Sequence, residues 1–403
     1  MTAMQGAAFD DHLARRNAIV LAVAQALYGG CTTAFVVTSG LIGSQLAPQP
    51  FLSTLPQSML IVGTAATTLP LSLLMRRIGR KAGFVGAALV GAAGALGGTF
   101  AIYQRNFMVF LFSCLLIGIY QASASYYRFA AADLASPALR PKAISWVMTG
   151  GVIAALLGSL MVIATVDLLA PVTFAGTWIA MALLALLGVA VLQFVNIPVS
   201  GDAAHGTGRP LAVIASQPTY VVATGVNMIA YAVMMLVMTA TPVAMLACGF
   251  SVQNSSWVIQ WHALAMFVPS FFTGTLITLF GVERIVLAGM AMLALAGVSG
   301  VMGITFGNFA IDLVFLGLGW NFGFIGGTTM LTAAYRAEER NKAQGLSDFL
   351  VFAATTLASL GAGAFMATSG WGAVNMTIFP LAALGAALTA WQWTKTRRVT
   401  DFV

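Results

Sequence analysis

Long apolar stretches separated by short polar turns cover almost the whole chain. Twelve of them are long enough to cross a membrane as helices, because about 20 apolar residues span the hydrocarbon core. They lie at 18–41, 54–75, 83–103, 107–127, 143–165, 173–194, 219–246, 257–280, 285–305, 309–333, 343–366 and 375–393. This pattern predicts an all-α integral membrane protein with twelve transmembrane helices.

The longest polar interruption divides the pattern in the middle, from Asn196 to Pro218. We therefore expect an N-terminal six-helix half over 1–195, a cytoplasmic linker over 196–218 and a C-terminal six-helix half over 219–403. Six spans, a linker and six further spans are typical of transporters built from two parallel repeats.

Two short matches favour an internal repeat. The segment Arg140–Ala143 before the fifth span matches Arg340–Ala343 before the eleventh, 200 positions later. Gly79, between the second and third spans, has its counterpart in Gly281, 202 positions later. Because the two offsets are nearly equal, together they indicate two homologous halves.

Composition and charge agree with a membrane protein and orient it. Only 7% of the 403 residues are charged and 60% are hydrophobic, whereas a soluble domain has about 25% charged residues. If both termini are cytoplasmic, 17 of the 18 basic residues lie inside and only Arg105 lies outside. Topology then explains the basic residues without a nucleic-acid partner. We expect a multi-pass protein of a bacterial inner (plasma) membrane.

Sequence motifs of enzymes are missing. The chain has no phosphate-binding GxxxxGK[ST] loop, no HExxH and no CxxC pair, and its three cysteines cannot form a disulfide framework. We expect neither enzymatic activity nor a cofactor.

Two methionine and histidine pairs carry the most specific chemistry. Met234 and Met238 lie four residues apart on the seventh span, and His262 and Met266 lie four apart on the eighth. Residues at this spacing share one face of a helix. The two spans run antiparallel, so Met238 lies near the depth of His262 and Met234 near that of Met266. Thioethers and a neutral imidazole suit Cu(I) better than Mg²⁺, Ca²⁺ or Mn²⁺. The pattern predicts four ligands for one transported copper ion.

Simpler roles remain open for these residues. A methionine on an apolar span usually fills packing gaps, and an intramembrane histidine can form a structural hydrogen bond to a neighbouring helix. Among other residues inside the spans, Asp312 is a candidate proton carrier. Trp320 and Asn321 either face a cavity or pack. Cys31 could pass copper on, although a buried inert thiol is its simpler role. Cys248, just outside Met245, could meet incoming metal first.

The chain resembles the major facilitator superfamily over nearly its whole length. The resemblance lies in the loop Arg77–Lys81 and in the glycines of the fifth span, Gly150, Gly151 and Gly158. Ser159 stands where the superfamily's antiporter motif has proline, which counts against a drug antiporter.

Within the superfamily, the paired Met-x-x-x-Met and His-x-x-x-Met patterns are similar to the CcoA-type copper importers and their CalT-like branch. This resemblance implies the superfamily fold and secondary-active Cu(I) uptake by alternating access. It also implies a supply of copper for assembly of cbb3-type cytochrome oxidase. The implied partners are the copper ion, the lipid bilayer and copper chaperones or oxidase assembly factors, with the protein acting as a monomer.

Two other functions remain open. One is an exporter of an organic solute or drug, in which the methionines form an adaptable apolar pocket. The other is a copper-binding sensor or assembly factor that transports nothing, although the chain has no sizeable soluble domain to support it. The direction of transport rests on the resemblance alone.

Overall fold

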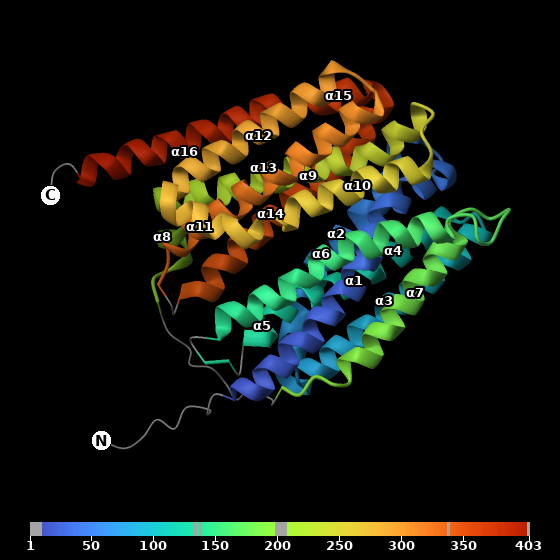
Figure 1. The fold of residues 1–403 in the computed structure, drawn as a ribbon, viewed down its shortest axis with the longest axis horizontal. Helices are drawn as coiled ribbons and strands as arrows, with labels where there is room; N and C mark the ends of the chain where they lie inside the picture. Colours follow the sequence, from blue (N-terminus) through green and yellow to red (C-terminus); the bar gives the residue numbers. More distant parts are fainter. Residues whose placement is uncertain (1–9, 133–134, 137–138, 198–207, 337–338, 401–403) are drawn as a thin grey trace. The chain divides into compact units, whose positions relative to one another are not determined.

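The computed structural model describes residues 10–400 except 133–134, 137–138, 198–207 and 337–338, and this part of the chain is helical without strands (Figure 1). Contacts divide the chain into two compact units. One comprises Met1–Thr38 with Met59–Asp202, and the other Ser39–Ser58 with Ala203–Val403. The helices α1 and α2 contribute residues to both units.

The first unit is a helical bundle with closely packed helices. Its helices are α1 (Asp11–Leu46), α2 (Leu55–Ile78), α3 (Arg80–Tyr103), α4 (Phe107–Ala124), α5 (Tyr127–Ala132), α6 (Arg140–Thr165) and α7 (Ala175–Leu192), and the short 3-10 turn η1 (Pro50–Leu52) precedes α2. A Cβ at Gly150 of α6 would lie 2.4 Å from the carbonyl oxygen of Ala22 on α1. Glycine therefore allows α6 to approach the α1 backbone, as small residues do between membrane helices.

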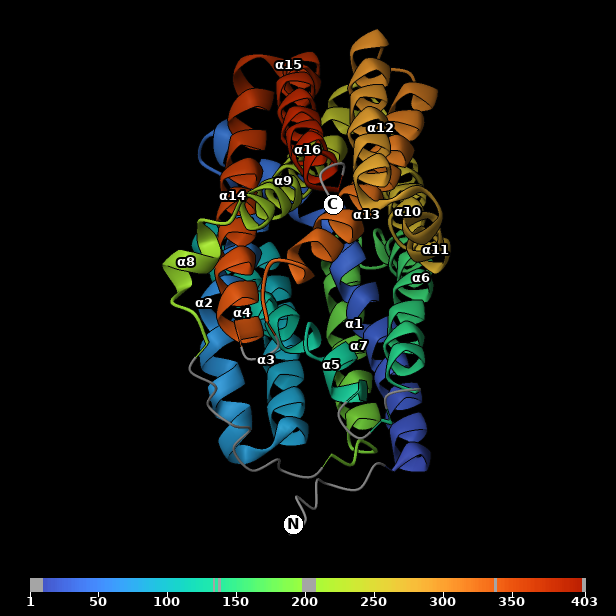
Figure 2. The same cartoon turned by 90° about the vertical axis from the view of Figure 1, so that its left-hand side faces the viewer.

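The second unit is arranged around α13, which packs against α9, α10 and α12. Its helices are α8 (Leu211–Ala215), α9 (Pro218–Ala247), α10 (Val252–Phe267), α11 (Ser270–Phe280), α12 (Val282–Met302), α13 (Phe306–Thr332), α14 (Arg340–Thr368), α15 (Gly370–Met376) and α16 (Ile378–Thr400). Helix α12 also runs beside α16 (Figures 1 and 2).

The predicted fold class is confirmed, with one correction. Within the described residues, eleven helices are long and apolar enough to cross a membrane, and α10 with α11 makes a twelfth span bent by 43°. The sequence predicted one continuous helix over 257–280, and this is wrong. Pro269 follows α10 and has no N–H to continue the helical hydrogen bonds, so the span breaks there.

The repeated segments have matching local structure. Gly79 joins α2 to α3 with φ 88° and ψ 154°, and Gly281 joins α11 to α12 with φ 87° and ψ 150°. Only glycine adopts such a conformation without strain. Arg140 and Arg340 each begin a helix, α6 and α14. The members of each pair thus occupy equivalent positions in the backbone, since both glycines join two helices and both arginines begin one.

Residues 39–58 have their contacts in the second unit, although they precede the linker in the chain. The hydroxyl of Ser58 lies 3.0 Å from that of Ser359 on α14, and Thr54 donates a hydrogen bond to the Ser359 carbonyl oxygen at 2.9 Å. Gln57 donates to the thioether sulfur of Met235 at 3.8 Å. This polar layer attaches Thr54 and the first turn of α2 to α9 and α14. No sequence pattern singled it out.

Candidate functional site

The four predicted copper ligands lie on α9 and α10 at matching depths. Met238 is about 14 Å from the end of α9 at Ala247, and His262 is about 15 Å from the start of α10 at Val252. Met234 and Met238 are buried, His262 is fully buried and Met266 is half-buried. The predicted register of the two pairs therefore agrees with the helix bounds.

Both pairs are directed towards α13. On α9, Ala230 lies against Gly323 of α13, where an added Cβ would be 3.0 Å from the Ala230 Cβ. Asn227 also lies against α13, at Gly327, and Met234 and Met238 follow it at seven and eleven residues, so they share its side of α9. His262 Nδ1 lies 2.7 Å from the carbonyl oxygen of Leu313 on α13.

Helix α13 therefore gives a packing partner to each pair. His262 Nε2 is buried and has no hydrogen-bond partner among the described residues. Within the same part of the chain, no group of three or more His, Cys, Asp or Glu could hold a metal ion. The methionine-based copper site stays a prediction.

Asn321 bridges the break between α10 and α11. Its side-chain Nδ2 donates to the carbonyl oxygen of Met266 and to Ser270 Oγ, both at 2.7 Å. Its Oδ1 accepts a hydrogen bond from Thr273 at 2.6 Å. Of the two roles considered for Asn321, the structure supports packing, because the fully buried side chain faces the break. One amide therefore fixes the bend of this span.

Four aromatic rings gather beside this break, and we name them the aromatic cluster: Tyr231 of α9, Phe267 of α10, and Trp320 and Phe324 of α13. The rings of Trp320 and Phe324 stack at 5.0 Å between centroids. Tyr231 meets both edge-on, at 5.3 Å and 5.2 Å, and Phe267 lies 6.4 Å from Trp320. Trp320 is buried, whereas the other three rings are half-buried.

Trp320 and Tyr231 lie midway along their helices, and Phe267 ends α10 at the break of its span. Trp320 is about 21 Å from the start of α13, and Tyr231 is about 20 Å from the start of α9. Transporter binding sites lie at this depth, often where a helix is interrupted. The Nε1 of Trp320 is buried and has no hydrogen-bond partner among the described residues. A donor is therefore present beside the stacked rings.

The surroundings of the aromatic cluster are electrically neutral. Helices α9, α10 and α11 contain no Asp, Glu, Lys or Arg, and α13 contains only Asp312. Asp312 lies about 12 Å along α13 from Trp320. The cluster can thus stack on an uncharged planar ligand, but it offers no counter-charge for an ionic one.

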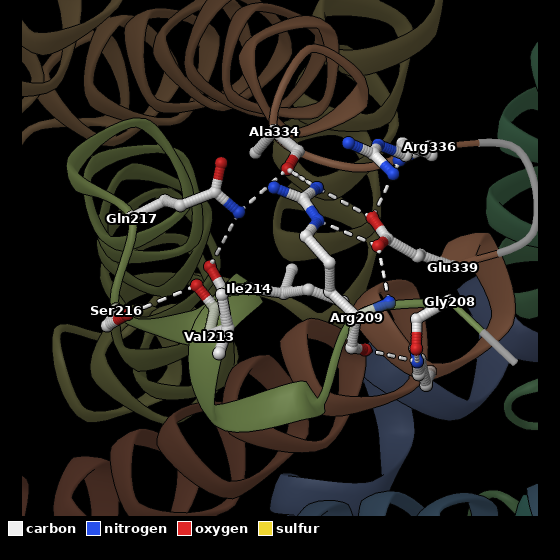
Figure 3. Close-up of polar contacts among 10 residues, drawn as sticks. Gly208, Arg209, Val213, Ile214, Ser216, Gln217, Ala334, Arg336 and Glu339 are labelled. Carbon is white, nitrogen blue, oxygen red and sulfur yellow. Dashed lines mark hydrogen bonds and ion pairs between the residues drawn. The ribbon is translucent and has the colours of Figure 1, made fainter.

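A second polar feature, which we name the linker clasp, joins residues 208–217 to the turns before and after residues 337–338 (Figure 3). Arg209 donates to Glu339 through Nε at 2.7 Å and through Nη2 at 2.6 Å. Gln217 donates to the Ala334 carbonyl oxygen at 3.0 Å, and Lys342 donates to the carbonyl oxygens of Gly208 and Arg209. The rest of the predicted linker, 198–207, lies outside the described residues.

Glu339 is the centre of the clasp. It is fully buried and also accepts hydrogen bonds from the backbone N–H of Arg209 at 2.8 Å and of Arg336 at 2.9 Å. The side-chain hydrogen bond from Arg209 comes first among the causes that hold the pKa of Glu339 well below its ordinary value of 4.5. The sequence places Arg209, Arg336 and Lys342 on the basic side, but spacing alone did not indicate their partner.

The cysteines give no support to copper relay. Cys31 is buried, and its Sγ donates to the carbonyl oxygen of Met181 at 3.3 Å. This favours the simpler prediction of an inert thiol. Cys248 is exposed at the end of α9.

The chain is similar to known transporters over most of its length. It is 42% identical over 378 residues to the riboflavin transporter RfnT of Brucella anthropi, which covers 93% of this chain and 95% of that protein. The uncharacterized MFS-type transporters YdeG and YddS of Bacillus subtilis are 29% and 26% identical and cover 84% and 85% of this chain. They are matched over 83% and 82% of their own lengths. No family model matches the chain.

A solved structure supports the fold. The crystal structure of a mutant form of the nucleoside transporter NupG matches with a TM-score of 0.67 at 15% identity, covering 94% of this chain and 98% of that one. These similar proteins are membrane transporters and not enzymes, and they act without a cofactor. Their names give no support to the copper-importer branch, to copper as substrate or to copper chaperones as partners.

Proposed function

Because the chain belongs to the MFS-type transporters, the major facilitator superfamily, we propose that it carries a neutral organic solute with a planar aromatic ring system, riboflavin first, across a bacterial membrane. This is the organic-solute alternative left open by the sequence, made specific by the aromatic cluster.

The observation that carries the proposal is the aromatic cluster at mid-membrane depth. The isoalloxazine ring of riboflavin is flat, has two broad π-faces and carries no formal charge at neutral pH. Rings such as Trp320 and Phe324 stack favourably on such a face. The unpartnered Nε1 of Trp320 provides a donor for the polar edge of such a heterocycle. The 42% identity to a riboflavin transporter independently supports this class of solute.

The charge of a flavin should determine whether it is transported. A phosphorylated flavin carries a phosphate that needs Arg, Lys or several N–H donors when it leaves water. The helices that bear the aromatic cluster carry no basic residue within their spans. We therefore expect transport of riboflavin and rejection of flavin mononucleotide.

The test is flux in liposomes that contain the purified protein. Labelled riboflavin should enter saturably, and unlabelled lumichrome, which retains the ring without the ribityl chain, should compete. Ribitol and flavin mononucleotide should not compete. The same liposomes without protein are the control. Absence of saturable riboflavin flux would overturn the proposed substrate but leave the membership of the superfamily intact.

Copper is the second candidate, supported by one observation. His262 Nε2 is buried without a hydrogen-bond partner among the described residues and lies at the depth of Met238. A neutral imidazole nitrogen of this kind is a soft-metal ligand. On this proposal Met234, Met238, His262 and Met266 would bind Cu(I) as the transported substrate.

Metal analysis separates the two candidates. For copper transport, the purified protein should retain copper under reducing conditions, and the double variant Met238→Ala with His262→Ala should not. Met245→Leu is the matched control, since Met245 is a buried methionine nearer the end of α9. Equal copper content in all three proteins, or displacement of copper by equimolar manganese, would refute a methionine-based site.

A further inference from the structure

Asp312 of α13 is a fully buried carboxyl group. Both side-chain oxygens are inaccessible to solvent, and neither has a hydrogen bond within the described part of the chain. Buried ionisable groups inside a membrane are costly and are retained where they bind or move something. Binding of a neutral solute requires no ionisable side chain, so the proposed substrate does not by itself explain Asp312.

The register of α13 shows which helices surround Asp312. Gly319 and Gly323 follow it at seven and eleven residues, so they share its side of the helix. A Cβ at Gly319 would meet Leu293 of α12 at 2.7 Å, and one at Gly323 would meet Ala230 of α9 at 3.0 Å. Asp312 therefore faces the space between α9 and α12, on a different side from the carbonyl of Leu313 that His262 contacts.

Helix α15 adds two more unpartnered polar groups near this end of α13. Phe309, one turn before Asp312, packs on the ring of Trp371 at 4.9 Å. Trp371 Nε1 and Asn375 Oδ1 are both buried without hydrogen-bond partners among the described residues. Asn375 lies against Gly300 of α12, where a Cβ would come within 2.2 Å of its side chain. A polar region inside the bundle thus surrounds the end of α13 that carries Asp312.

The helices packed on α13 provide no counter-charge to Asp312. Helices α9, α11 and α15 contain no Asp, Glu, Lys, Arg or His. The charged residues of α12, Glu283 and Arg284, are in its first turn, at the other end from Gly300. On α10, His262 directs Nδ1 to the Leu313 carbonyl oxygen. An unpaired carboxylate is unstable in such surroundings, whereas the neutral acid is tolerated.

We propose that Asp312 is a proton-binding site whose proton is exchanged once per transport cycle, so that movement of the solute is coupled to protons. The reaction is a single protonation, in which one carboxylate oxygen gains or loses H⁺. Asn308 lies one turn from Asp312, is half-buried and is hydrogen-bonded to Ser299. It lies between Asp312 and Thr305, at the exposed start of α13, and is hydrogen-bonded to Thr305. Helix α13 carries both Asp312 and Trp320. A movement of α13 when Asp312 gains or loses its proton would therefore also move the aromatic cluster.

The proton site itself is tested without any substrate, by infrared spectroscopy of the purified protein at neutral pH. A carbonyl band of a protonated carboxylic acid should be present in the wild type, lost in Asp312→Asn and shifted in Asp312→Glu. Glu283→Gln is the control and should keep the band. An unchanged band in Asp312→Asn would overturn the proton site. If Asp312→Asn does not fold, the shift of the band in Asp312→Glu still tests the proton site.

The coupling rests on the proposed function and is tested by flux. An inward proton gradient should drive riboflavin accumulation by the wild type. Asp312→Asn should fill the liposomes only to the outside concentration while keeping riboflavin exchange. Accumulation by Asp312→Asn at the wild-type level, or loss of its exchange, would overturn the coupling. If the wild type moves no riboflavin at all, the proposed function fails, and the infrared result still decides the proton site.

Discussion

The guanidinium of Arg209 and the carboxylate of Glu339 lie 2.6 Å apart, and this ion pair holds the last part of the linker to the start of α14. Glu339 is fully buried and the Arg209 side chain is 30% exposed. Hydrogen bonds from two backbone N–H groups hold the carboxylate in place on its other side. Because the carboxylate is held on both sides, this ion pair should contribute more to the stability of the fold than an exposed surface ion pair, whose contribution is usually small.

Replacing Glu339 by Gln should loosen the linker clasp. The amide presents N–H donors where Arg209 and the Arg336 N–H need an acceptor, so donors would face donors. We expect several-fold faster trypsin cleavage after Arg336, whose backbone N–H Glu339 holds, and a lower midpoint of thermal unfolding. Glu283→Gln, which removes a carboxylate outside the clasp, is the control. Equal cleavage rates in wild type and Glu339→Gln would contradict a holding role for the pair.

The clasp should be stable at neutral pH and weaken only in acid. The pKa of Glu339 lies well below its ordinary value of 4.5 because Arg209 donates to the ionised form. A group with a lowered folded-state pKa contributes its full stability above the unfolded value and loses it as the pH falls towards the folded value. The difference in unfolding midpoint between wild type and Glu339→Gln should therefore be constant above about pH 5 and shrink below pH 4.5. A difference that already falls between pH 8 and pH 6 would point to another group.

The apolar pattern was sufficient to predict the helical fold, but it did not predict the bend in the eighth span. Hydropathy measures apolar length, and residues 257–280 are apolar throughout. The proline at 269 was visible, but membrane helices often tolerate proline. Asn321, 52 positions after Pro269, supplies hydrogen bonds across the break. Such a long-range partner has no local signature.

The candidate sites, too, were predictable from local spacing only in part. Four-residue spacing predicted that each pair shares one face of its helix, because the rise and rotation per residue are fixed. It could not show that both pairs face α13, because that depends on how α9 and α10 are rotated about their own axes. The aromatic cluster was missed for a related reason. Tyr231 and Trp320 are far apart in sequence and meet only through the packing of α9 on α13.

Trp320→Ala should weaken riboflavin binding. Removal of an aromatic ring that stacks on a base costs about 1–3 kcal/mol, or about 5- to 150-fold in affinity, and Trp320 has the largest ring of the aromatic cluster. Trp320→Phe keeps a ring but loses the Nε1 donor, so its loss should be smaller. Quenching of riboflavin fluorescence by the purified protein measures the affinity. Trp391→Ala is the control, because Trp391 is 44% exposed on α16. Equal affinities of the Trp320 and Trp391 variants would exclude the aromatic cluster as the site.

Asn321→Ala should lower both stability and transport, because one side chain joins α10, α11 and α13. The change removes the donors to Met266 and Ser270 and the acceptor for Thr273. Thr273 also donates to the Pro269 carbonyl oxygen at 2.8 Å, so its hydroxyl keeps a partner. With interhelical hydrogen bonds in membranes worth about 0.6–2 kcal/mol each, we expect a loss of about 1–3 kcal/mol. The thermal midpoint in detergent and riboflavin flux in liposomes measure the two effects.

Thr278→Ala provides the matched control on the same span. Thr278 is exposed on α11, and its hydroxyl hydrogen-bonds to carbonyl oxygens of its own helix, those of Gly274 and Thr275. Its removal should leave the midpoint and the flux close to those of the wild type. If Asn321→Ala behaves like Thr278→Ala in both measurements, the amide is not what fixes the 43° bend. The bend would then follow from Pro269 alone, and Pro269→Ala, which restores the missing N–H, should change riboflavin flux where Asn321→Ala does not.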